Sequence, residues 1–319
     1  MFKRFLLQLP AWAQPDHPVL RHLIQRRRSR QAGWRRALRL GLLLMAVALV
    51  VLFGYQLATG FGTRPVRTLH SVLYGPLVLG GVVVGLGAMA LTGNAISLEK
   101  AQGTWDSLRI TAYGAGLTFQ ARWVSVFYML RAPLGALFLA RLVFVAGILI
   151  DLIQYYRGRY LDLLLSGITP AVSMPVGAVL LAATMTAGLL QPLVAVGLDA
   201  AVGLLVSVVV RQPRYDILVR AALGLGRVAL AALALLMGSQ ALEFPPWMTP
   251  LGAWAGLLFQ SVFGDQGLRL LSLEESGALW ADLPYGLLFG LVLLFLTLSQ
   301  AWLAGRIVAW AARLAEHAE

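Results

Sequence analysis

Long apolar segments separated by short polar stretches run along most of the chain. Each is at least as long as the roughly 20 mostly apolar residues that a helix needs to cross a bilayer. This pattern predicts membrane-spanning helices in six places, near residues 37–59, 72–92, 132–154, 172–210, 217–239 and 284–305. The composition agrees, because 59% of the 319 residues are hydrophobic and only 13% are charged, against about 25% charged residues in soluble domains. The predicted fold class is an all-α membrane protein.

One apolar segment is much longer than a single crossing requires. Residues 172–210 contain Pro192 and Gly197 near their middle, and a proline inside a helix kinks or breaks it. The segment is therefore either one long, kinked span or two short ones. The choice decides on which side of the membrane the C-terminus lies.

The connection before the last predicted span, 240–283, contains an apolar stretch of its own. Pro245 and Pro246 break the chain there, and residues 250–264 are apolar but too short to span a bilayer. Two structures fit this pattern. One is a re-entrant or interfacial helical segment, and the other is a folded external loop with two surface helices.

Basic residues gather beside the first predicted span. Residues 26–36 read RRRSRQAGWRR, and the positive-inside rule places such a block in the cytoplasm. We therefore predict that 1–36 is a cytoplasmic amphipathic segment in the membrane interface, and that 37–319 is a single transmembrane domain. The formal net charge of +12 is then explained by the lipid bilayer rather than by nucleic acid.

Alternation of the spans assigns a side to each connection. The loops 93–131 and 211–216 fall in the cytoplasm, where their basic residues agree with the rule. The 240–283 segment falls outside and contains the acidic residues Glu243, Asp265, Glu274, Glu275 and Asp282.

The residues of common enzyme sites are missing from the sequence. The chain has no cysteine, so thiolate metal sites are excluded. Its two lysines, Lys3 and Lys100, do not stand in a G-x-x-x-x-G-K-[ST] phosphate-binding loop. We therefore expect no catalytic residues, no metal and no cofactor bound by this chain itself.

Charged residues within apolar spans are rare and are candidates for a functional role. Arg141, Asp199 and Arg227 lie inside predicted spans. Asp199 and Arg227 fall on successive spans and can form a buried ion pair; the alternative is a role along a substrate path. Asp151 and Arg220 lie near span ends and are expected to extend outwards to the interface.

One polar connection differs from the others. Residues 96–114 read ISLEKAQGTWDSLRITAYG, and their apolar positions can form one side of a short amphipathic helix near 94–112. Its apolar side would contain Ile96, Leu98, Ala101, Trp105 and Leu108. The residues alone leave open whether this helix only rests in the interface or docks a soluble partner.

The string ISLEKAQGTWDSLRIT, placed after the second predicted span, resembles the coupling-helix region of type-2 ATP-binding cassette (ABC) transporter permeases. The matching positions are Ile96, Ser97, Glu99, Lys100, Gln102, Gly103, Thr104, Trp105, Leu108 and Thr111. Ala112 stands where the family often has proline. Residues 17–30, HPVLRHLIQRRRSR, are similar to the family's N-terminal interfacial helix, although His17 and His22 replace its Asn and Glu. Six spans with an external helical segment before the last are also the family's plan.

The resemblance implies a transport function. In the family, two permease subunits pair as a homodimer or heterodimer, and each inserts its coupling helix into a cytoplasmic ABC ATPase subunit that binds ATP and Mg. Carried over to this chain, the positions at the ATPase would be Glu99, Lys100, Gln102, Gly103, Thr104 and Asp106, with Trp105 anchoring the helix on its own transmembrane domain. The expected function is an exporter permease in the cell membrane with a cytoplasmic N-terminus. The alternative is a non-catalytic scaffold or accessory subunit of a larger membrane complex.

Overall fold

The structure, a computed structural model, describes residues 10, 13–14, 20–21, 65–93, 114–150, 173–210, 212–242, 249–265, 267–271, 283 and 286–317. The predicted first span, 37–59, and the predicted coupling helix, 94–112, lie outside the described residues, as does Asp151. Regular structure in the described ranges is helical throughout. The α-helices are α4 (Pro65–Gly93), α7 (Gly114–Met129), α8 (Arg131–Ile150), α10 (Met174–Val209), α11 (Pro213–Leu242), α12 (Pro250–Phe263) and α14 (Phe289–His317). Two short 3-10 helices, Arg269–Leu271 and Gly286–Leu288, precede α14.

Five of these helices, α4, α8, α10, α11 and α14, are long and apolar enough to cross a membrane. They fall on five of the six predicted spans, and their ends differ from the predicted ones by a few residues in most places. The chain is therefore a membrane-embedded, all-helical protein in the part that the structure describes.

Helix α10 settles the question raised by the longest apolar segment. Met174–Val209 is one continuous helix of 36 residues with Pro192 inside it. At the rise of an α-helix it is about 54 Å long, which exceeds the hydrocarbon core of a bilayer, about 30 Å. The alternative of two short spans is wrong.

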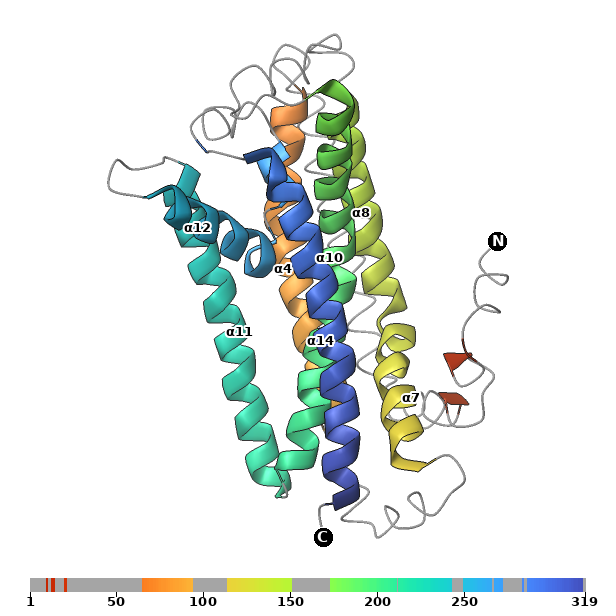
Figure 1. Cartoon of the computed structure of the whole chain (residues 1–319). Coiled ribbons are helices and arrows are strands. Elements are labelled where there is room, and N and C mark those ends of the chain that lie inside the picture. Colours follow the sequence, from red (N-terminus) through yellow and green to blue (C-terminus); the bar gives the residue numbers. More distant parts are fainter. Residues whose placement is uncertain are drawn as a thin grey trace.

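The helix ends form two groups at opposite ends of the bundle (Figure 1). One group contains the end of α4, the start of α7, the turn between α10 and α11, and the end of α14. We call this the C-terminal end of the bundle. The other group, at what we call the α12 end, contains the start of α10, the end of α8 and the start of α12. The start of the predicted cytoplasmic loop 93–131 and the predicted loop 211–216 thus lie at the same end of the bundle. The prediction of a loop is wrong for 114–129, which form α7 and pack against α10 and α14.

Helix α10 is the centre of the bundle and packs most extensively against α14 and α4. One apolar cluster joins α10 to α4, α7 and α8 through residues such as Val84, Val126 and Phe144. A second cluster joins α10 to α7 and α14 near the C-terminal end, and most of its buried residues on α14 are alanines. Small residues suit this role because membrane helices associate through close backbone packing.

Two glycines permit especially close contacts with α10. A Cβ on Gly290 of α14 would overlap Thr184 Oγ1 and the Leu180 carbonyl of α10. A Cβ on Gly203 of α10 would likewise overlap Thr92 and the Met89 carbonyl of α4. Because the obstructing atoms include backbone, a larger residue at either position must push the two helices apart.

We predict that Gly290→Ala destabilises the protein, by about 1–3 kcal/mol, because the new methyl group overpacks the α10–α14 contact. Gly305→Ala on the same helix is the matched control, since a Cβ there meets nothing within 4 Å and alanine favours the helix. SDS denaturation in mixed micelles measures both variants. Equal stability of the two variants would contradict the close contact at Gly290.

Candidate functional site

Helix α12 has well-defined ends. The Thr249 side chain accepts a hydrogen bond from the Gly252 amide at 3.2 Å, and Pro250 occupies the first helical position. Both features are typical of a helix N-terminus. The helix buries Ala253, Gly256, Leu257, Gln260 and Ser261 and packs mainly against α11.

The end of α12 lies in the middle of the bundle. Gln191 of α10 donates its amide to the Val262 carbonyl at 3.0 Å, and Tyr74 of α4 donates its hydroxyl to the Gly264 carbonyl at 3.2 Å. Gln191 lies about 25 Å along α10 from the start of that helix. The last turn of α12 and the residue after it therefore reach into the bundle (Figure 1). The stretch 272–282, predicted to form the second helix of this segment, lies outside the described residues.

Asp265, directly after α12, turns its carboxylate into the bundle. Its backbone has φ 58°, a left-handed conformation that aspartate tolerates better than most residues. The carboxylate forms an ion pair with Arg141 of α8, whose side chain is 2% exposed against 19% for Asp265. Asp265 therefore supplies, inside the bundle, the counter-charge that the buried guanidinium of Arg141 needs.

Pro192 explains the second partner of Arg141. Proline has no amide hydrogen, so the carbonyl four residues earlier in a helix loses its normal donor. In α10 that carbonyl belongs to Gly188, and Arg141 donates a hydrogen bond to it through Nη1. One guanidinium thus binds both the carbonyl that Pro192 leaves without a donor and the carboxylate that follows α12.

The predicted ion pair between α10 and α11 is present. Arg227 Nε lies 3.6 Å from Asp199 Oδ2, and their side chains are 18% and 10% exposed. At this distance the pair is not a hydrogen bond, and among the described residues neither of these two atoms makes one. A Cβ on Gly85 of α4 would overlap the Asp199 carboxylate, so α4 packs directly against the pair.

Arg220 does not extend outwards, and that prediction is wrong. Its Nε and Nη2 donate to the Asp216 carboxylate one turn earlier, at 3.1 and 2.6 Å. Asp216 is fully buried, and a buried carboxylate needs a nearby positive charge. The Arg220 side chain also lies across Gly93, the last residue of α4.

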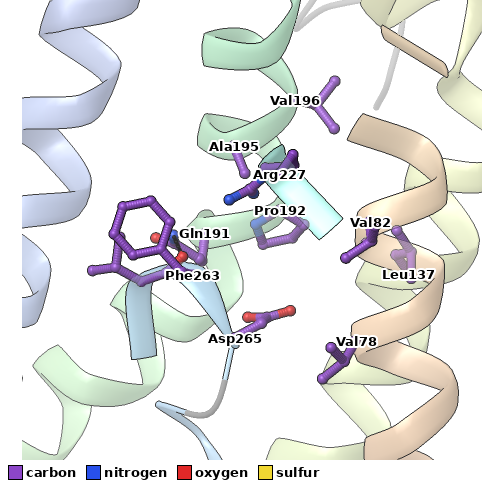
Figure 2. A pocket seen from close by; sticks show the side chains of 12 residues that line it. Val78, Val82, Leu137, Gln191, Pro192, Ala195, Val196, Arg227, Phe263 and Asp265 are labelled. Atoms are coloured by element: carbon purple, nitrogen blue, oxygen red, sulfur yellow. Dashed lines mark hydrogen bonds between the residues drawn. The ribbon is translucent and has the colours of Figure 1, made fainter. Parts of the chain in front are cut away.

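A small cavity separates Asp265 from Arg227, with Gln191 at its side (Figure 2). Its volume is about 20 Å³, and its remaining wall is largely apolar. Gln191 also accepts a hydrogen bond from Thr297 at 3.1 Å and donates one to Gln300 at 3.4 Å, both on α14. Polar groups from α8, α10, α11, α14 and the residues after α12 therefore meet at the middle of the bundle.

Sequence reasoning identified three of these residues and missed the others. Arg141, Asp199 and Arg227 were candidates because they are charged within apolar spans, whereas Asp265 and Gln191 were not among the candidates. Pro192 was the available sequence signal for a polar centre here, because a proline in mid-span leaves a carbonyl without a helical donor and that carbonyl needs another partner. The candidate coupling residues, from Glu99 to Asp106, lie outside the described residues.

The fold and the site together define a membrane-embedded helical protein with an internal polar centre, which the end of the short helix α12 reaches. The described residues contain no group of three or more His, Asp or Glu side chains that could hold a metal ion. Comparison with protein-family models, with curated proteins and with solved structures found no match.

We predict that Arg141→Met destabilises the protein by about 3–5 kcal/mol, because it leaves the Asp265 carboxylate buried without a counter-charge. Asp265→Asn leaves Arg141 unpaired and is expected to be similarly destabilising. The double variant removes both charges, so its loss should be clearly smaller than the sum of the two single losses.

SDS denaturation in mixed micelles measures these losses. Arg131→Met is the matched control, because Arg131 lies exposed at the start of the same helix, and it should change stability by no more than about 0.5 kcal/mol. Losses that add up in the double variant would show that Arg141 and Asp265 act independently.

A third prediction concerns Pro192. Pro192→Ala restores an amide donor for the Gly188 carbonyl, so it should stabilise most where Arg141 no longer serves that carbonyl. We expect Pro192→Ala to gain about 0.5–1.5 kcal/mol more in the Arg141→Met/Asp265→Asn background than in the wild type, which is the value of one hydrogen bond. The same denaturation experiment checks it, and an equal gain in both backgrounds would contradict the proposed partner exchange.

Proposed function

We propose that this chain is the membrane-spanning permease subunit of an ABC transporter, an exporter driven by separate ATPase subunits. The observation that carries the proposal is the string ISLEKAQGTWDSLRIT at 96–111, with its Glu-Lys pair followed by Gln-Gly-Thr-Trp. This pattern resembles the coupling helix of type-2 permeases in both residue order and position after a predicted span.

The arrangement of the described helices supports the proposal. Helix α4 ends at Gly93 and α7 begins at Gly114, both at the C-terminal end of the bundle (Figure 1). The connection that contains the string therefore starts and finishes on the end where α10 turns into α11 and where α14 finishes. A soluble partner bound to this connection would approach a single end of the bundle.

In this proposal the permease and the ATPase subunits have separate roles. Two copies of the permease, or this chain and a related one, form the translocation path in the cell membrane with their N-termini in the cytoplasm. The ATPase partners bind ATP and Mg, since this chain has no phosphate-binding loop. Glu99, Gly103 and Thr104 contact the ATPase, with Lys100, Gln102 and Asp106 beside them, and Trp105 fastens the helix to its own transmembrane domain.

Lys100 and Asp106 contribute to the contact mainly through charge. Complementary charges at an interface govern orientation and association rate more than final affinity. Their substitution should therefore slow assembly without abolishing it. Gly103 has a different role, because a residue without Cβ permits close backbone approach.

We predict that Glu99→Ala and Gly103→Trp uncouple the partner ATPase while the permease still folds. The test purifies the tagged chain from its native membranes, labels co-purified subunits with an azido-ATP photoprobe, and measures ATP hydrolysis of the complex. The wild type should bring down an ATP-labelled subunit and stimulate its hydrolysis. Both variants should lose most of that stimulation.

Gly135→Trp is the matched control for added bulk, because Gly135 is exposed on α8 and a Cβ there meets nothing within 4 Å. Wild-type stimulation in both Glu99→Ala and Gly103→Trp would overturn the coupling role of this segment. A stable native complex without any ATP-labelled subunit would instead favour the scaffold or accessory-subunit function. ATP-independent turnover by the isolated chain would favour an enzyme.

A further inference from the structure

We propose that the cavity between Arg227 and Asp265 is a binding site for a water molecule, and that this water joins the two ion pairs of the bundle into one network. The proposal is independent of the transport function. It concerns a site inside the described bundle, between α4, α10, α11 and the residues after α12.

The size and lining of the cavity fit one water molecule. Its volume is about 20 Å³, and a cavity needs roughly 10–15 Å³ to hold a water. Cavities lined only by apolar groups stay dry, whereas buried waters typically have two to four polar partners. Here a guanidinium, a carboxylate and an amide line the same space, from Arg227, Asp265 and Gln191 (Figure 2).

The charges around the cavity exclude other small ligands. Two guanidinium groups, of Arg141 and Arg227, disfavour a cation, and two carboxylates, of Asp199 and Asp265, disfavour an anion. The four groups already form two ion pairs, so the site is close to neutral. A neutral molecule that can both donate and accept hydrogen bonds suits it best, and the volume restricts that molecule to water.

The Asp199–Arg227 pair lacks hydrogen bonds that this water can supply in part. The 3.6 Å separation of its closest atoms is too long for a hydrogen bond, and each side chain is largely buried. A buried charged group without full hydrogen bonding is costly. A water between Arg227 and Asp265 gives the guanidinium an acceptor and the carboxylate a second donor beside Arg141.

Helix α4 leaves room for this network. Gly81 and Gly85 lie four residues apart, on one face of the helix. A Cβ on Gly85 would overlap the Asp199 carboxylate, and one on Gly81 would lie 3.8 Å from Asp265 Oδ2. Both carboxylates therefore lie against the same glycine-bearing face of α4, with Arg227 lining the cavity beside it.

The network matters most for α11. Only 17% of its apolar span is buried, against 61% for α10, so along that span apolar packing within the chain contributes less to its position than it does for α10. The water makes Arg227 an attachment point to the end of α12 as well as to α10. Helix α11 and the end of α12 are thereby coupled through polar groups inside the bundle.

A structure of the purified protein at a resolution that shows ordered water tests the site directly. We expect density within hydrogen-bonding distance of Gln191, Arg227 and Asp265. Ala195→Leu, which adds bulk to the cavity wall, should remove that density, while Ala232→Leu adds the same bulk on the exposed face of α11 and should keep it. An empty cavity in the wild type, or direct contact of Arg227 with Asp265, would overturn the proposal.

An energetic test asks whether the two ion pairs depend on each other. In the wild-type background, Asp199→Asn removes one carboxylate partner of Arg227, but the water-mediated contact with Asp265 remains. The midpoint temperature of thermal unfolding should therefore fall by only a few degrees. In the Arg141→Met/Asp265→Asn background the same substitution leaves Arg227 with no carboxylate, and the fall should be several degrees larger. Equal falls in both backgrounds would refute the coupling.

Ala195→Leu supplies a second background if the double variant does not accumulate in the membrane. Excluding the water while leaving all four charges in place should again enlarge the fall caused by Asp199→Asn. Ala232→Leu is the control background and should leave that fall unchanged. A fall independent of Ala195→Leu would mean that the two ion pairs act separately.

Discussion

The contact of Arg141 with the Gly188 carbonyl and Asp265 is the interaction on which the rest of the polar centre depends. A helix that contains Pro192 must leave one carbonyl without its helical donor, and the hydrocarbon around the bundle supplies no bulk water to replace it. Arg141 supplies the donor, but it thereby brings a charge into the bundle. Asp265 neutralises that charge, and to do so the chain after α12 has to reach the middle of the bundle.

Polar pairs and small residues, rather than apolar burial, determine which helices lie together in this protein. Lipid is as apolar as a leucine side chain, so burial of apolar surface gives little preference for one helix neighbour over another. The close contacts of α10 with α4 and α14 depend instead on Gly203 and Gly290. The loosely packed α11 is held by Arg227 at Asp199 and by Arg220 across Gly93.

Helix α4 connects the polar centre with the segment that contains the permease-like string. At its middle, Gly81 and Gly85 lie against the two central carboxylates, and at its end Gly93 lies under Arg220. The segment with the permease-like string begins directly after that end. If the string docks an ATPase as we propose, displacement of this segment acts on α4, and through Arg220 on α11, because close-packed contacts of this kind do not absorb movement.

Sequence by itself determined the class of the protein, the approximate place of five described spans, and the candidacy of Arg141, Asp199 and Arg227. These are local properties, since the length and hydropathy of a segment decide whether it can cross a bilayer. The tertiary structure decided that α10 is a single helix, that Arg220 pairs with Asp216, and that the partner of Arg141 is Asp265, 124 residues away. That last pairing depends on the path of α12 into the bundle and on the left-handed turn at Asp265, and neither follows from residue spacing. A local pattern shows that a buried charge needs a partner, but only the fold brings the partner to it.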